Sequence, residues 1–191
     1  IKCGWAGAQD RIKYIQGDLR YDLDKLESEH FDLVYHQAAT VDTTVIDAEQ
    51  MIATNFTAFV ALVDLCLKKQ AKVVYASSAA VYGNTPSPNA VNRGEEPLNA
   101  YGRSKLMMDN YVREHAATWP VPVIGLRYFN VYGAGEEHKG TMKSMIGQMR
   151  ANFAADQPIE LFERGEQKRD FIHVSDVVHC NLLAGEGEST G

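Results

Sequence analysis

The chain has 191 residues, 45% of them hydrophobic and 23% charged, and a formal net charge of -6. This composition is typical of a soluble globular protein with one sizeable core, and the length favours one domain, or one domain with a small lobe. The acidic balance argues against nonspecific nucleic-acid binding, which needs clustered Lys and Arg. We see no apolar run near 18 residues, so we expect no membrane-spanning segment.

Cysteine and histidine usage gives a second set of limits. Cys3, Cys66 and Cys180 are odd in number and widely spaced, which indicates a reducing compartment rather than a disulfide framework. The six histidines show no metal-ligand spacing, so we expect no structural metal. A cytoplasmic protein is therefore expected.

The predicted elements alternate between strands and helices along most of the chain. Short apolar runs indicate strands, and apolar residues on one side of a longer run indicate a helix. In chain order they are strands 13–15 and 31–35, helix 49–69, strand 73–76, a Pro/Asn/Gly-rich loop 83–97, helix 100–117, strand 122–127 and helix 141–154. This alternation predicts an α/β fold with a parallel sheet and helices on both faces. The loop is placed to cover a ligand.

Tyr101 and Lys105 are the residues most suggestive of chemistry. Four residues apart in the predicted helix 100–117, they project from the same face and can work as one acid/base unit. Ser78 lies in a small-residue turn directly after strand 73–76, so its hydroxyl can converge on Tyr101. A phenol is a poor base at neutral pH, but a nearby ammonium and an oxidised nicotinamide both favour the phenolate and draw its pKa down. The three residues predict a redox site in which Tyr101 takes the hydroxyl proton of an alcohol while hydride leaves its carbon.

In this interpretation Lys105 tunes Tyr101 and holds the cofactor ribose. A Tyr-x-x-x-Lys spacing by itself more often joins a packed tyrosine to a solvated lysine. The serine turn 23 residues before Tyr101 and the strand 122–127 after it favour the redox interpretation.

Further motifs occur in the order typical of one enzyme family. They are Gly17-Asp18-Leu19, His36-Gln37-Ala38-Ala39, Asn55, Arg127-Tyr128-Phe129-Asn130-Val131-Tyr132-Gly133 and Arg169-Asp170-Phe171-Ile172-His173-Val174-Ser175-Asp176-Val177. With the Ser/Tyr/Lys set, they make the chain resemble the extended short-chain dehydrogenase/reductases, the family of NAD-dependent epimerases and dehydratases, from about residue 11 to residue 178. The resemblance implies a Rossmann-like, doubly wound parallel sheet with a small substrate-binding lobe.

The resemblance also implies roles for individual residues. Those implied to contact the cofactor, NAD or NADP, are Asp18, Leu19, Gln37, Ala38, Ala39, Asn55, Tyr101, Lys105 and Tyr128. Those implied to bind a nucleotide-diphosphate sugar are Ser78, Asn130, His138, Phe162 and Arg169. Structural alternatives remain: a turn at Gly17-Asp18, a core histidine at His36, a polar helix residue at Asn55, a loop amide at Asn130 and a surface cation at Arg169.

One hallmark of the family is absent from this sequence. The family opens with a strand, a glycine-rich turn and a helix whose N-terminus holds the dinucleotide pyrophosphate. Gly4 and Gly7 follow no apolar strand and lack a third glycine, so we interpret them as linker. We expect an internal segment of a longer enzyme, with residues 1–133 forming a Rossmann domain that lacks its first βαβ unit. Residues 134–191 are expected to form the substrate lobe and a return segment to the sheet.

The segment after Gly133 narrows the implied chemistry. Glu136-Glu137-His138-Lys139-Gly140-Thr141-Met142 resembles the segment of ADP-glycero-manno-heptose 6-epimerases in which a lysine is a second catalytic residue opposite the tyrosine. Lys139 matches that lysine, and a second acid/base suits an intermediate that must be reduced on its other face. The alternative is an exposed lysine before a helix capped by Thr141. Ala79 and Ala80 stand where dehydratases and decarboxylases of the family carry an acid, which favours epimerisation.

The expected function is that of an NAD(P)-dependent nucleotide-sugar epimerase of lipopolysaccharide precursor synthesis, with catalytic residues Ser78, Tyr101, Lys105 and Lys139. A UDP-hexose 4-epimerase is the alternative enzyme. A non-catalytic or RNA-binding member of the fold is the alternative of another class, to be recognised by a basic surface stripe and by poor alignment of Tyr101 with Ser78. The expected partners are a nucleotide-diphosphate sugar and further copies of the chain, with neither nucleic acid nor membrane.

Overall fold

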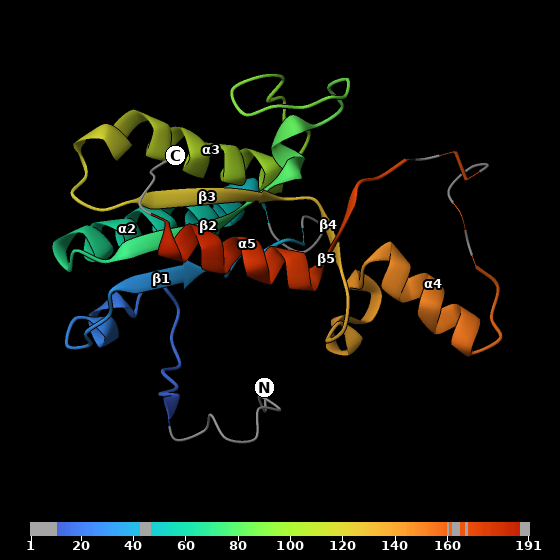
Figure 1. Ribbon diagram of the computed structural model, residues 1–191, viewed down its shortest axis with the longest axis horizontal. Helices are drawn as coiled ribbons and strands as arrows, with labels where there is room; N and C mark the ends of the chain where they lie inside the picture. Colours follow the sequence, from blue (N-terminus) through green and yellow to red (C-terminus); the bar gives the residue numbers. More distant parts are fainter. Residues whose placement is uncertain (1–10, 43–46, 160, 162–164, 167, 188–191) are drawn as a thin grey trace.

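A computed structural model of the protein describes residues 11–42, 47–159, 161, 165–166 and 168–187. Its centre is a three-stranded parallel sheet in the order β1-β2-β3, formed by Leu33–His36, Lys72–Ser78 and Val123–Tyr128 (Figure 1). The register pairs Val34 with Val73, and Val73 with Val123. The expected parallel sheet is confirmed.

Helices cover both faces of this sheet. On one face lie α3 (Ala100–His115) and a continuous helical segment made of α1 (Ala48–Ile52), a π-helical turn (Ala53–Thr57) and α2 (Ala58–Lys68). On the other face lies α5 (Val174–Glu186), which contacts β2 and β3 (Figure 1). Lys72 secures the end of α5 by donating from Nζ to the Gly185 carbonyl at 2.8 Å. The doubly wound arrangement is therefore confirmed.

The core lies between β2 and the helices α2 and α3. Its buried members are Phe59, Leu62, Val63, Cys66, Ala71, Val73, Tyr75, Met108, Val112 and Val123. Side chains alternate along a strand, so Val73 and Tyr75 enter this core while Val74 and Ala76 face α5. The stretch Ala48–Lys68 is long and apolar enough to cross a membrane, contrary to our sequence-based expectation. Its residues Phe59, Leu62, Val63 and Cys66 are buried in this core.

The remaining elements are short. The 3₁₀ turns η2 (Leu23–Leu26), η4 (Ala79–Tyr82) and η5 (Ala116–Thr118) connect the layers. The strand predicted at 13–15 is wrong, since that segment is irregular in the structure. Tyr14 is 83% exposed and Ile12 56% exposed, so this apolar run has no surface to pack against.

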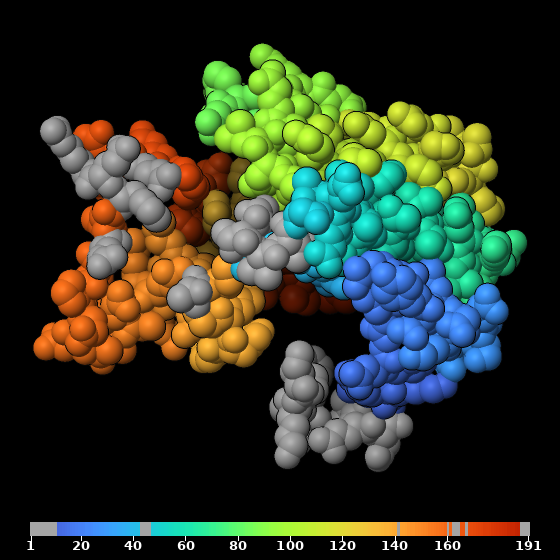
Figure 2. Space-filling model, turned by 180° about the vertical axis from the view of Figure 1, so that it is seen from behind, coloured from blue at the N-terminus to red at the C-terminus, as the bar shows by residue number. Residues whose placement is uncertain are grey.

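A smaller unit follows β3. Strands β4 (Asn130–Tyr132) and β5 (Phe171–His173) pair in parallel, and between them lie η6 (Glu137–Met142) and α4 (Met145–Ala154). Figure 2 shows α4 and its neighbours, in orange, as a lobe beside the sheet and its helices. The helix predicted from residue 141 begins only at Met145, and Ser144 caps it by accepting from the Gly147 N–H at 3.0 Å.

Candidate active site

Tyr101 and Ser78 are brought together by the start of α3 and the end of β2. Asn99 caps α3 by accepting from the Gly102 N–H at 2.8 Å, which places Tyr101 in the first turn. A Cβ at Gly102 would lie 2.6 Å from the Ala80 carbonyl oxygen, so a larger residue would push the helix away from the serine turn. The Ser78 hydroxyl lies close enough to the Tyr101 hydroxyl to act on it as a hydrogen-bond partner. The convergence predicted from the sequence is confirmed.

The titration of Tyr101 differs from our expectation. Burial raises the pKa of Tyr101, and the hydrogen bond to Ser78 only partly offsets this. The ammonium of Lys105 lies 5.8 Å from the centroid of the Tyr101 ring and binds the Ala76 carbonyl instead of the phenol oxygen. Lys105 therefore does not by itself lower the pKa of the phenol in this geometry, contrary to the sequence-based argument.

Lys105 is a buried cation rather than a solvated one. It is 1% exposed, and its Nζ donates to the Ala76 carbonyl at 2.7 Å. Burial lowers the pKa of Lys105 to about 8, although the nearby carboxylate of Asp109 opposes the change. Most molecules therefore keep the ammonium at neutral pH, ready to hold a hydroxyl or an oxyanion.

This shift predicts a pH dependence of stability. The pKa of Lys105 is about 8 in the folded chain and 10.5 ordinarily, so between these pH values the unfolded chain binds more protons. The free energy of unfolding should therefore rise with pH in this window, relative to Lys105→Met, by about 3 kcal/mol. Urea unfolding of both proteins from pH 7.5 to 10.5 checks this, because the other titrating groups are common to both. A difference that does not change with pH would contradict the assignment.

Asn55 links three parts of the site. It is 1% exposed and lies in the π-helical turn, a feature often found at functional sites. Its Oδ1 accepts from the Thr40 N–H at 2.8 Å, and its Nδ2 donates to the Thr40 carbonyl at 2.9 Å and to the Ser104 Oγ at 3.1 Å. Ser104 in turn donates to the Tyr101 carbonyl at 2.8 Å. These contacts join the loop after β1 to the catalytic face of α3, as expected of a residue that steadies the site.

Behind the site lies a buried carboxylate that the sequence analysis missed. Asp109 accepts from Tyr75 at 2.9 Å, from Ser77 at 3.0 Å and from Nε of Arg127 at 2.9 Å. Arg127 also pairs with Glu95 of the loop after η4. Ser77 directly precedes Ser78, so this network holds the serine turn against α3. The sequence signal that could have identified Asp109 is its position one helical turn after Lys105.

Asp109→Ala should lower the free energy of unfolding by about 3–5 kcal/mol, because it leaves a buried guanidinium and two buried hydroxyls short of an acceptor. Urea denaturation measures the change. Asp64→Ala on α2 is the matched control, since Asp64 is exposed and accepts only a 3.4 Å bond from Tyr111. A loss for Asp109→Ala no larger than that of the control would show that the network contributes nothing to stability.

Polar side chains gather at the carboxyl ends of β1 and β3. Gln37 Nε2 donates to Asn181 Oδ1 at 3.1 Å, and the Tyr128 hydroxyl donates to Gln37 Oε1 at 3.0 Å. Asn181 comes from α5 and was not identified from the sequence, because its partners lie 53 and 144 residues away. Ala38 and Ala39 follow directly in the chain, so small residues adjoin this polar group.

His36 is a core residue next to this group. It is 5% exposed and packs on Phe59 with ring centroids 5.6 Å apart. Burial, with a contribution from the charge of Lys105, lowers the pKa of His36 to about 4. Its buried Nε2 has no hydrogen-bond partner within the described part of the chain. His36 is therefore neutral, and it leaves one polar atom unsatisfied at the end of β1.

These groups fit a dinucleotide. In doubly wound sheets, ligands bind in the crevice at the carboxyl ends of the strands, where Gln37, Ser78 and Tyr128 lie. Amide, hydroxyl and ammonium donors suit the ribose and carboxamide oxygens of a nicotinamide nucleotide, and the unsatisfied Nε2 of His36 adds a free polar atom at this edge. Asn55, Tyr101, Lys105 and Tyr128 remain predicted cofactor contacts on this basis.

Asp18, which the family resemblance implies to contact the adenine ring of the cofactor, lies in a turn. The Asp18 carbonyl accepts from the Tyr21 and Asp22 N–H groups at 2.9 and 2.8 Å, and the Asp18 carboxylate pairs with Arg20 at 2.7 Å. The hydrogen bond from Arg20 lowers the pKa of Asp18 to about 2. Leu19 packs against the core. The turn that was the structural alternative at Gly17-Asp18 is therefore present, and contact between Asp18 and adenine stays a prediction.

Apart from Ser78, which ends β2, the predicted substrate residues within the described part of the chain lie on the smaller unit. Asn130 is at the start of β4, and its side-chain amide donates to the Asp170 carbonyl at 2.9 Å. Arg169 adjoins Asp170, so the pairing of β4 with β5 brings Asn130 and Arg169 into one region. Both are exposed. His138 is an exposed residue of η6, and Phe162 lies outside the described residues.

Lys139 is exposed on η6, next to His138. Its backbone N–H donates to the Glu136 carbonyl at 3.0 Å, while its ammonium forms no hydrogen bond or ion pair with any residue the structure describes. Contact between Lys139 and the Tyr101 site is not present in this conformation. Its role as the second acid/base stays a prediction.

The sequence and the fold are similar to those of known proteins. A family profile described as the NAD dependent epimerase/dehydratase family matches residues 4–191. The chain belongs to this family. Among the described residues, no cluster of three or more His, Cys, Asp or Glu side chains is placed to hold a metal ion.

Individual relatives are consistent with that membership. The ADP-L-glycero-D-manno-heptose-6-epimerase of Cupriavidus pinatubonensis is 39% identical over 156 residues, which cover 78% of this chain and 47% of the relative. The crystal structure of the Helicobacter pylori enzyme of the same name is 45% identical, with a TM-score of 0.89 over 93% of this chain and 57% of that one. A UDP-glucuronic acid 4-epimerase from Bacillus cereus, in complex with NAD, is 26% identical, with a TM-score of 0.77 over 92% and 55%. The chain spans about half the length of these relatives.

Proposed function

We propose that the full-length protein is an NAD(P)-dependent nucleotide-sugar epimerase that acts on ADP-glycero-manno-heptose. The observation that carries the proposal is the convergence of the Ser78 hydroxyl on that of Tyr101, with the buried ammonium of Lys105 5.8 Å from the centroid of the tyrosine ring. The relatives named heptose 6-epimerase, at 39% and 45% identity, support the choice of sugar.

In this proposal Tyr101 removes the proton of a substrate hydroxyl and Ser78 holds the same oxygen. NAD or NADP, when bound, accepts hydride from the carbon that carries this hydroxyl and later returns it. Loss of the proton and hydride leaves a carbonyl, which turns in the site so that its other face meets the returning hydride. Lys139 then supplies the proton on that face, and the product is the epimer. Asn130 and Arg169 are proposed to hold the diphosphate.

In the experiment, the full-length protein is incubated with NAD or with NADP, and with one of three substrates: ADP-heptose, UDP-galactose or UDP-N-acetylglucosamine. The epimer formed from each substrate is measured. We expect interconversion of the ADP-heptose epimers and no turnover of the UDP-sugars. Turnover of a UDP-sugar without ADP-heptose would support the 4-epimerase alternative. Turnover of none would support a non-catalytic or RNA-binding member, against which the alignment of Tyr101 with Ser78 and the net charge of -6 already argue. A cytoplasmic location, expected from the cysteine usage, and assembly into a homo-oligomer are also part of the proposal.

A further inference from the structure

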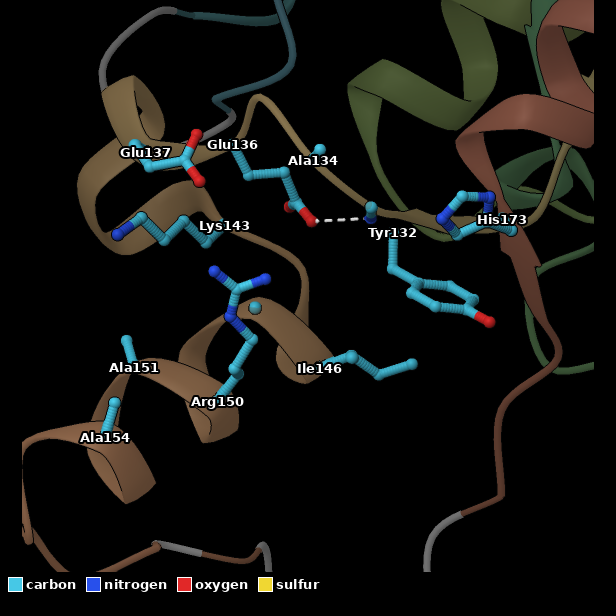
Figure 3. A pocket seen from close by; sticks show the side chains of 12 residues that line it. Tyr132, Ala134, Glu136, Glu137, Lys143, Ile146, Arg150, Ala151, Ala154 and His173 are labelled. Carbon is cyan, nitrogen blue, oxygen red and sulfur yellow. Dashed lines mark hydrogen bonds between the residues drawn. The ribbon is translucent and has the colours of Figure 1, made fainter.

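Glu136 is a buried carboxylate with three hydrogen bonds from its own segment. It is 8% exposed. Its Oε1 accepts from the Gly133 N–H at 3.1 Å and from the Ser144 hydroxyl at 2.9 Å, and its Oε2 accepts from the Ser144 N–H at 2.6 Å. Figure 3 shows the Glu136 side chain reaching the backbone beside Tyr132 at the rim of a 470 Å³ cavity.

These three bonds close a loop. Gly133 directly follows β4, and Ser144 is the N-cap of α4. The carboxylate therefore ties together the two ends of the segment 134–143, which carries His138 and Lys139. Within this loop the backbone also bonds to itself, from the Lys139 N–H to the Glu136 carbonyl at 3.0 Å and from the Lys143 N–H to the Gly140 carbonyl at 3.4 Å.

The bonding pattern requires a carboxylate. Burial raises the pKa of Glu136, but the hydrogen bonds from Ser144 and Gly133 and the charge of Lys139 outweigh it and lower the pKa overall. Glu136 is thus ionised, with both oxygens used as acceptors. A glutamine has the same shape but replaces one oxygen with an NH₂ donor, which would face the N–H of Ser144 in one orientation of the amide and the N–H of Gly133 in the other. An unmet buried donor costs more than the hydrogen bond itself contributes.

The neighbouring glycine is a second, independent feature of the same loop. Gly140 has φ +54° directly after Lys139, a backbone conformation that L side chains rarely adopt. No atom lies within 4 Å of a Cβ built there. An alanine at this position would therefore strain the loop through its backbone alone.

We propose that Glu136 is a positioning residue for Lys139: by joining Gly133 to Ser144 it holds the loop in the conformation that presents the lysine to the substrate. The inference rests on the proposed function, in which Lys139 completes the second half of the epimerisation. It assigns Glu136 no contact with the reacting atoms.

The test compares Glu136→Gln with Glu137→Gln in the full-length protein. Glu137 is the adjacent, exposed carboxylate and forms no hydrogen bond with any residue the structure describes. We expect Glu136→Gln to lower the kcat of ADP-heptose epimerisation about 10²-fold, since small misplacements of a catalytic group have effects of that size. The Tyr101-dependent half-reaction, measured as cofactor reduction, should stay within about 3-fold, and Glu137→Gln should match the wild type in both assays.

Further variants separate the possible outcomes. Gly140→Ala leaves Glu136 unaltered and should likewise lower epimerisation while it spares the Tyr101-dependent half-reaction. It replaces Glu136→Gln as the test if that variant fails to fold. If Glu136→Gln and Gly140→Ala both epimerise normally while Lys139→Met does not, the positioning role is wrong and the proposed function stands. If Lys139→Met also epimerises normally, the proposed function of Lys139 fails first. Equal loss of both reactions in a folded Glu136→Gln protein would make Glu136 a general structural residue and overturn the inference.

Discussion

Tyr101→Phe in the full-length protein is expected to lower the rate of epimerisation by at least about 10²-fold, the size of effect typical of losing a general acid/base. The substitution removes only the hydroxyl that is bonded to Ser78. The ring remains to pack beside the ammonium of Lys105, so the fold should be retained. Steady-state turnover of ADP-heptose, with circular dichroism as the folding check, measures the effect.

Tyr111→Phe is the matched control for this prediction. Tyr111 lies on the same helix, and its hydroxyl makes only a 3.4 Å bond to Asp64. Its removal should leave turnover within a few-fold. If Tyr101→Phe turns over at the rate of this control, Tyr101 is a packing residue and the Ser/Tyr/Lys site is not the catalytic one.

Lys139→Met is expected to abolish epimerisation while Tyr101 still runs a half-reaction on one face of the sugar. The physical reason is geometric, because a base on one face of a carbonyl cannot serve its opposite face. The remaining half-reaction would appear as reduction of the cofactor or as dismutation of a heptose-like aldehyde analogue.

Lys143→Met, a few residues along the same loop, is the control for Lys139→Met. Lys143 is half-buried and lines the cavity beside Glu136, but it has no part in the proposed chemistry. Retention of epimerase activity by Lys139→Met within a few-fold would assign Lys139 to the exposed-lysine alternative. It would then favour the 4-epimerase reading of the family.

The secondary structure was predictable where the signal is local. The strands of the central sheet are short apolar runs, and α3 begins at Asn99, a residue type that caps helices well. The segment 13–15 has a similar apolar content but no neighbouring strand in the structure, so composition alone misassigned it. The start of α4 was misplaced because Glu136 captures Ser144 and Gly140 interrupts the helical path.

Residue type and spacing were enough to bring Ser78, Tyr101 and Lys105 into one site, because two of them share a helix face and the third ends the preceding strand. The same information placed the chain in its family. The raised pKa of Tyr101, the burial of Lys105 and the roles of Asp109, Asn181 and Glu136 depended on the folded chain. Protonation depends on local burial and on the charges nearby. For Asp109 and Asn181 those neighbours come from distant parts of the chain, and for Glu136 they come from the path that one loop takes.

Burial holds the pKa of Tyr101 above its ordinary value of 10.0, so a cation other than Lys105 has to favour the phenolate. The residue pattern identified which groups react. Tertiary packing decided the charge each one carries and which neighbours hold it, because both depend on desolvation and on contacts made across the sheet, the helices and the loop after β4.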